Sequence, residues 1–162
     1  ILQHGLGEYD VDGAIAARGS TNLSVLNTFL KHPYFKRKPP KSLDRNEFSL
    51  QLAEQCNLED GAATLSSFAV ETIKQSQVYF PTPVKQWIVC GGGRHNHFLL
   101  SQLREVLDQP VFDADDLGWQ GDAVEAQAFA YLAIRSSLGL PITFPNTTGV
   151  KAPITGGVRH NP

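Results

Sequence analysis

The stretch Trp87–Asn96, which reads WIVCGGGRHN, decides how this chain folds. Its first residues are apolar without polar alternation, which is typical of a short strand buried on both faces in a parallel sheet. Three glycines follow, and because they lack a Cβ atom, another backbone or a flat ligand can approach the chain closely there. Asn96 is a favourable N-cap for the amphipathic pattern that comes next. The stretch therefore predicts a strand, a glycine turn and a helix.

A second strand and helix are predicted on the C-terminal side of this stretch. Val111 and Phe112 are typical of a short strand, and a helical pattern begins at Asp122, with Glu125 in the position of a capping-box partner. The order strand–helix–strand–helix predicts two neighbouring parallel strands. The tail, residues 140–162, is rich in proline and glycine, so we expect an ordered loop if it docks and a frayed end if it does not.

The N-terminal half predicts short helices joined by loops. Helices are expected to begin at Asp12, after one of the candidate caps in Ser20-Thr21-Asn22, over Asp44–Gln55, and at Asp60. The segment Lys31–Lys41 holds five lysines and arginines together with three prolines, which favours a loop. Its charges fit either an anion-binding patch or a solvated loop that keeps the protein soluble.

The bulk composition indicates one globular domain over residues 1–162, with 41% hydrophobic residues and a formal net charge of −2. This charge gives no general attraction to nucleic acid or to an anionic membrane, and no apolar run approaches the roughly 20 residues of a membrane span. Cys56 and Cys90 lie far apart, form no metal-binding pair and suggest a reduced, cytoplasmic protein. Because methionine is absent, Ile1 is not a natural start, and we expect a piece of a longer protein.

The glycine turn is the first candidate site. Gly91, Gly92 and Gly93 lack the G-x-G-x-x-G spacing of dinucleotide-binding proteins, and no Walker lysine follows. Their position after a strand fits the wall of a nucleotide site or the tight packing of a strand–helix turn. His95 and His97 have no further ligands at metal-site spacing, so we expect exposed or capping histidines rather than a metal centre.

The acidic residues after the second strand are the other candidates. Asp113, Asp115 and Asp116 fit either a Mg²⁺ site or a solvated acidic turn. Glu125 fits the capping partner of Asp122, but its helix would also begin beside the glycine turn. A carboxylate there could bind sugar hydroxyls or orient a water molecule, and the two roles are compatible.

From about Tyr9 to its end, the chain resembles the anhydro-N-acetylmuramic acid kinase family. The order and spacing of several short motifs carry the resemblance. They are Tyr9-Asp10-x-x-Gly13, Pro33-Tyr34-Phe35, Pro39-Pro40-Lys41-Ser42, Cys90-Gly91-Gly92-Gly93-x-His95-Asn96, Gly121-Asp122-Ala123-x-Glu125-Ala126, Leu140-Pro141 and Thr148-Gly149.

The resemblance implies an α/β fold, the helix-rich C-terminal lobe of an actin-, sugar-kinase- and heat-shock-ATPase-like protein with a few parallel strands. It implies that ATP phosphorylates the 6-position of 1,6-anhydro-N-acetylmuramic acid while water opens the anhydro ring, in cell-wall recycling in the bacterial cytoplasm. Mg²⁺ would arrive with ATP, without a metal site of the protein's own. The implied roles are nucleotide binding by Gly91, Gly92, Gly93 and Asn96, and sugar binding by Glu125 and Asp122. Glu125 is also the implied catalytic residue.

One departure from the family limits what the chain is expected to do alone. The motif Asp-x-Gly-Pro-Gly-Asn, which carries the water-activating aspartate in the family, is absent from these 162 residues, and so is the first phosphate loop. Because phosphoryl transfer needs charged groups from both walls of the cleft, we expect an inactive lobe whose partner is the missing N-terminal lobe. Homodimer formation is left open. The alternative is a non-catalytic domain of the same fold that contacts proteins, and the upstream reading frame would discriminate the two.

Overall fold

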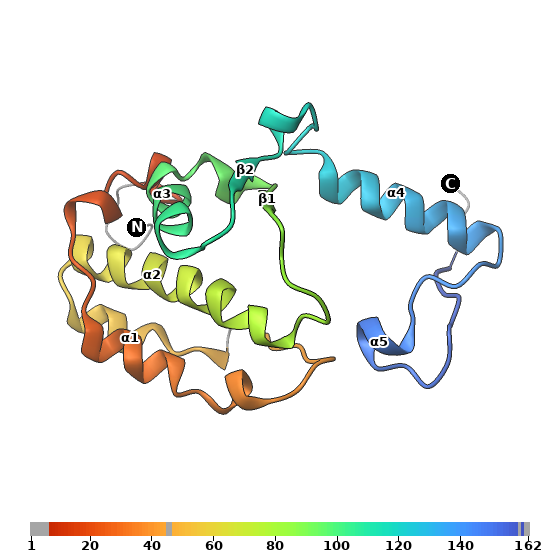
Figure 1. The fold of residues 1–162 in the computed structure, drawn as a ribbon, viewed down its shortest axis with the longest axis horizontal. Coiled ribbons are helices and arrows are strands. Elements are labelled where there is room, and N and C mark those ends of the chain that lie inside the picture. The colour runs from red at the N-terminus through yellow and green to blue at the C-terminus, as the bar shows by residue number, and fades with distance from the viewer. Residues whose placement is uncertain (1–6, 45–46, 159, 161–162) are drawn as a thin grey trace.

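The computed structural model describes residues 7–44, 47–158 and 160, which form a helix-rich domain with two parallel strands (Figure 1). Short 3₁₀ turns connect many of the elements. The helices and strands are α1 (Leu23–Leu30), α2 (Leu58–Ser76), β1 (Trp87–Val89), α3 (His97–Val106), β2 (Val111–Asp113), α4 (Val124–Ser137) and α5 (Pro145–Thr148).

The two predicted strands form and pair in parallel. Trp87 lies opposite Val111, and Val89 lies opposite Asp113. The predicted burial of the first strand on both faces is wrong for the described part of the chain, because all three residues of β1 are only partly buried. Helices α2 and α3 supply the cover that β1 and β2 have there, and the sheet contains no further strand among the described residues.

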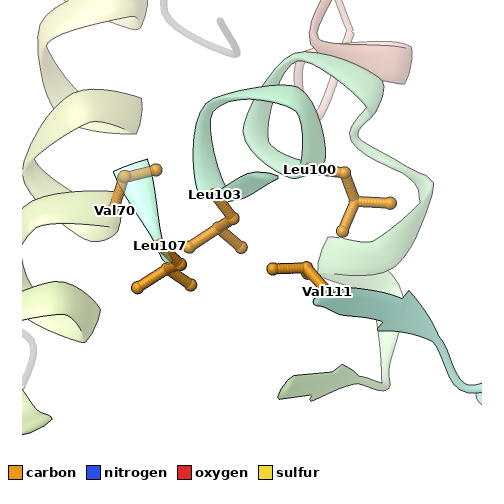
Figure 2. Close-up of a cluster of buried hydrophobic side chains, with 5 residues drawn as sticks. All are labelled: Val70, Leu100, Leu103, Leu107 and Val111. Atoms are coloured by element: carbon orange, nitrogen blue, oxygen red, sulfur yellow. The ribbon is translucent and has the colours of Figure 1, made fainter. Parts of the chain in front are cut away.

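Helix α2 lies between α1 and α3 and has a hydrophobic cluster on each side (Figure 1). Figure 2 shows the cluster formed by Val70, Leu100, Leu103, Leu107 and Val111, which joins α2 to α3 and β2. The second cluster consists of Val25 and Phe29 of α1 and Ala53 of the 3₁₀ turn Leu50–Gln55, and Leu65 and Phe68 of α2 pack against it. Because α2 is covered on two sides, it provides the largest fully buried side chains among the described residues, Val70 and Thr64.

The predicted N-terminal helices differ in where they begin. Asn22, one of the predicted candidates, caps α1, and its Oδ1 accepts hydrogen bonds from the amides of Ser24 and Val25. Helix α2 begins before Asp60, because Asn57 provides the cap. The predicted helix from Asp12 is wrong: the segment forms two 3₁₀ turns, and the Asp10 carboxylate accepts from the amides of the second turn.

The helix predicted for Asp44–Gln55 forms only in part, and the segment Lys31–Lys41 forms the predicted loop. The region Asp44–Gln55 contains a 3₁₀ turn, Leu50–Gln55, in place of most of the predicted helix, and residues 45–46 lie outside the described residues. In the basic loop, the Lys41 amino group donates to the carbonyls of Tyr34 and Phe35 and lies over the rings of Tyr34 and Tyr79. This lysine therefore holds the loop together, whichever role its other charges have.

Helix α4 extends away from the body of the domain, and the chain then turns back, so that α5 lies below α4 in the view of Figure 1. No residue of α4 is buried, and Phe129, Ile134 and Leu138 are each at least 60% exposed. Within residues 140–158, Thr143 and Ile154 form an antiparallel bridge. Gly149, the C-cap of α5, lies near Pro40 of the segment Lys31–Lys41. No helix in the described part is long and apolar enough to cross a membrane.

Candidate functional site

The glycine turn at the end of β1 is open to its surroundings. A Cβ atom built at Gly91 or Gly92 would meet no atom within 4 Å, and one at Gly93 would meet only the Leu99 side chain, at 3.9 Å. Gly91 has φ 74° and ψ −176°, a backbone conformation that is essentially restricted to glycine. Packing within the described chain therefore does not explain the row of glycines, and the open backbone leaves room for a ligand.

Gly92, Gly93 and Asn96 line one cavity of about 710 Å³, and the loop Tyr9–Asp12 forms its opposite wall. The Asn96 Oδ1 atom accepts a hydrogen bond of 2.8 Å from the Leu99 amide and so caps α3, as the sequence predicts. The structure thus brings three of the four predicted nucleotide-binding residues to the same cavity. The fourth, Gly91, precedes them in the turn, and its amide donates to the Gly121 carbonyl at 2.9 Å.

Arg94 is the centre of this part of the molecule, with only 4% of its surface exposed. Its guanidinium lies 3.4 Å from Asp113 and 2.9 Å from Asp115, and it also binds Asp122 and the Gly91 carbonyl. A Cβ atom at Gly121 would lie 2.4 Å from the Arg94 Nε atom, so that glycine makes room for the guanidinium. Arg94 therefore ties the glycine turn to the end of β2 and to the start of α4.

The capping box predicted for Asp122 and Glu125 is wrong. Helix α4 begins at Val124 with Ala123 as its N-cap, and no side chain caps it. The Asp122 carboxylate instead binds Arg94 and the Nε2 atom of His95, because a buried guanidinium is a stronger partner than a backbone amide. Asp122 still lies beside the start of α4, but it acts through Arg94.

Glu125, the predicted catalytic residue, is exposed in the first turn of α4. It makes no hydrogen bond or ion pair within the described part of the chain, and it does not line the cavity at the glycine turn. The backbone link between Gly91 and Gly121 nevertheless places the beginning of α4 next to that turn. The carboxylate is thus free for a ligand of its own.

Asp113 ends β2, and Asp115 and Asp116 follow it. Two of these three aspartates are partners of Arg94, and neither of the two predictions, a Mg²⁺ site or a solvated turn, includes this pairing. Asp113 and Asp115 both pair with the guanidinium, and Asp115 also accepts from the Gly121 amide at 2.8 Å. Within the described residues, no group of three or more His, Cys, Asp or Glu side chains is placed to hold a metal ion. Cys56 and Cys90 are both free.

The contacts around Arg94 also shift the pKa values of Asp122, Asp115 and Arg94 itself. Hydrogen bonds lower the pKa of Asp122 to about 2, and the bond from Arg94 contributes more than the bond from His95. The pKa of Asp115 is lowered mainly by the hydrogen bond from the Gly121 amide and further by the one from Arg94. The Asp122 and Asp115 carboxylates in turn raise the pKa of Arg94. Arg94, Asp115 and Asp122 are therefore ionised at neutral pH, and one guanidinium is shared between more than one carboxylate.

This cluster predicts a pH-dependent contribution to stability. A carboxyl group whose pKa is lower in the folded state stabilises the fold above its ordinary pKa of 3.8 and loses that effect as the pH falls toward about 2. Replacing Asp122 by asparagine should therefore lower the melting temperature at pH 6, and the difference from the wild type should shrink steadily below pH ~4. Melting curves of both proteins test this, and a difference independent of pH would contradict it.

Sequence reasoning missed Arg94 and the wall formed by Tyr9–Asp12. A single arginine has no periodic signal, although its position inside a glycine turn with three aspartates downstream is a clue to ion pairing. The loop at Tyr9 lies about eighty residues away along the chain, and no local pattern connects it to the turn.

The chain is similar to known proteins over almost its whole length. A family model described as anhydro-N-acetylmuramic acid kinase matches residues 1–161. A relative with that name from Paramagnetospirillum magneticum is 46% identical over 164 residues, which cover 99% of this chain and 46% of the relative. Another from Methylobacterium nodulans is 49% identical over 154 residues, which cover 95% of this chain and 41% of the relative. The chain spans less than half the length of these two relatives.

Proposed function

The chain belongs to the anhydro-N-acetylmuramic acid kinase family, and from this we propose that it is the C-terminal lobe of such a kinase. The complete enzyme would transfer a phosphoryl group from ATP to the 6-position of 1,6-anhydro-N-acetylmuramic acid while water opens the anhydro ring. The product would be N-acetylmuramic acid 6-phosphate, formed in the cytoplasm during peptidoglycan recycling. In this proposal the fold is that of one lobe of an actin-like or sugar-kinase-like protein, with ATP held between two lobes.

The open glycine turn is the observation that carries the nucleotide assignment. Gly91 and Gly92 have no neighbour that a side chain would displace. Gly91 needs glycine for its backbone conformation, but Gly92 has no positive φ, so a ligand against its bare backbone would account for glycine there. They lie at the carboxyl end of a parallel strand, where ligands bind in open α/β sheets. The cavity of about 710 Å³ beside them is within the size range of small-molecule sites.

The proposed roles follow from this placement. Gly91, Gly92, Gly93 and Asn96 line the nucleotide, and Mg²⁺, carried by ATP, stabilises charge on the phosphates when it is bound. Glu125 binds the sugar and helps to orient the attacking water. Asp122 acts beside the sugar site, and its pairing with Arg94 keeps the start of α4 at a constant distance from the glycine turn.

The exposed apolar surface of α4 supports the assignment of the chain to one part of a larger fold. The helix carries few charged residues, and an apolar helix of this kind is normally covered by other structure. The relatives have more than twice the length that the chain spans, which is enough for a second lobe that covers this surface. Oligomerisation remains a second way to cover it, so a homodimer stays a proposal.

The direct test is to assay the complete enzyme with ATP, Mg²⁺ and 1,6-anhydro-N-acetylmuramic acid and to identify the product by mass spectrometry. We expect N-acetylmuramic acid 6-phosphate from the complete enzyme and no phosphoryl transfer from the 162-residue chain alone. Turnover by the chain alone would contradict the need for two lobes. A complete protein that binds neither ATP nor the sugar would instead favour the non-catalytic alternative.

Gly92→Ala makes the test specific for the glycine turn. The added methyl group would meet no protein atom, so we expect an unchanged melting temperature. If the nucleotide lies against this backbone, the KM for ATP should rise about tenfold, while the KM for the sugar stays near its wild-type value. An unchanged KM for ATP would contradict the proposal that the nucleotide binds at this turn.

A further inference from the structure

The cavity at the glycine turn has a second wall that the proposed function does not use. It is formed by the loop Tyr9–Asp12, which faces Gly92, Gly93, His95 and Asn96. The motif Tyr9-Asp10-x-x-Gly13 belongs to the resemblance described above, yet no ligand role follows from that resemblance for any of its residues. The question is which part of a ligand this wall would recognise.

The loop is held firmly in its place. The Asp10 carboxylate accepts hydrogen bonds from the Ile15 and Ala16 amides at 2.8 and 2.9 Å. Gly13 is buried against α3, and a Cβ atom there would lie 2.2 Å from the Asn96 Oδ1 atom. Asp10 and Gly13 therefore have structural roles, and they fix the loop against the residue that caps α3.

Tyr9 and Asp12 have no such structural role. Tyr9 is 68% exposed although it is a large aromatic residue, and Asp12 is exposed as well. Neither side chain makes a hydrogen bond or ion pair within the described part of the chain. Asp12 is also the only non-glycine residue among those described with a positive φ, 57°, a backbone conformation that such residues rarely adopt. Residues held in this way are found disproportionately at functional sites.

The chemistry of this wall suits the nucleoside end of a nucleotide better than its phosphates. A tyrosine ring stacks on a flat base, and a carboxylate accepts hydrogen bonds from ribose hydroxyls. The same carboxylate would repel phosphate groups, which carry charge of the same sign. The phosphates would then lie away from Asp12, against the backbone of the glycine turn.

We propose that Tyr9 and Asp12 bind the nucleoside of ATP, with the Tyr9 ring stacked on the base and the Asp12 carboxylate bonded to the ribose hydroxyls. The inference rests on the proposed function, because it assumes that the cavity holds a nucleotide. It adds a base and ribose subsite, formed by a loop about eighty residues from the glycine turn in sequence.

The test uses the complete enzyme and a set of matched variants. Tyr9→Ala should raise the KM for ATP about tenfold, since loss of base stacking has an effect of this order, whereas Tyr9→Phe should stay close to the wild type. Neither change should affect the KM for the sugar, nor the binding of inorganic triphosphate measured by calorimetry, because these lack the base.

Asp12→Asn removes the charge while keeping a residue that tolerates a positive φ. We expect it to weaken the binding of ATP several-fold but to leave the binding of 2′,3′-dideoxy-ATP unchanged, because that analogue lacks both hydroxyls. Glu8→Gln is the control, since Glu8 is an exposed carboxylate beside the loop that does not line the cavity. It should leave the binding of both nucleotides unchanged.

The outcomes separate the two proposals. A wild-type enzyme that neither binds ATP nor phosphorylates the sugar overturns the proposed function and this inference with it. A wild-type enzyme that phosphorylates the sugar, while Tyr9→Ala and Asp12→Asn keep wild-type KM values for ATP, overturns only the nucleoside subsite. Equal weakening of ATP and inorganic triphosphate by Asp12→Asn would also overturn it, because the effect would then be general rather than directed at the ribose.

Discussion

Replacing Glu125 by glutamine in the complete enzyme is expected to lower kcat by about a hundredfold and to leave the melting temperature almost unchanged. Glutamine has nearly the same shape but cannot accept a proton or carry a negative charge. If Glu125 orients the water or polarises the sugar, the loss falls on the chemical step. Folding should tolerate the change, because the exposed Glu125 carboxylate has no partner within the described part of the chain.

The matched control for this experiment is Glu105→Gln, at an exposed carboxylate in the last turns of α3. It should keep the wild-type kcat and KM values. The measurement is steady-state kinetics with both substrates, together with thermal unfolding of each variant. An unchanged kcat for Glu125→Gln, or a loss of activity that follows a lower melting temperature, would show that Glu125 has no role at the sugar.

The second large effect is expected at Arg94. Replacing it by leucine removes a buried guanidinium and leaves Asp113, Asp115 and Asp122 close together without a positive charge between them. Arg94 is buried and binds three carboxylates and the Gly91 carbonyl, whereas the side chains of Asp115 and Asp122 are more than half exposed to water. We therefore expect the melting temperature of the complete enzyme to fall by several degrees. Arg94→Lys should give an intermediate value, because one ammonium group cannot reach all the acceptors that the planar guanidinium reaches.

Arg18→Leu provides the comparison. Arg18 forms an ion pair with Glu59 at 3.7 Å, but the side chains are 60% and 39% exposed, so its loss should change the melting temperature little. Arg94→Leu and Arg18→Leu proteins that unfold at the same temperature would contradict the central position of Arg94. Because Arg94 also holds the Gly91 carbonyl, Arg94→Lys should in addition raise the KM for ATP.

Local patterns predicted the elements that depend on short stretches of sequence. The strand before the glycine turn, the cap at Asn96 and the cap at Asn22 all follow from side chains that act on backbone within a few residues. Such predictions failed where a distant partner competed. Asp122 has the spacing of a capping residue with Glu125, but Arg94, 28 residues earlier in the chain, takes its carboxylate.

The sequence by itself determined that a bare glycine backbone ends a strand and that a helix follows it, because steric freedom and capping are local properties of the chain. Only the tertiary structure decided what surrounds that backbone. The Tyr9–Asp12 loop reaches the cavity, and the guanidinium of Arg94 gathers carboxylates from the end of β2 and the start of α4. These arrangements join residues far apart in the chain, and their energy comes from contacts that form only when α2, α3 and the strand pair have packed together.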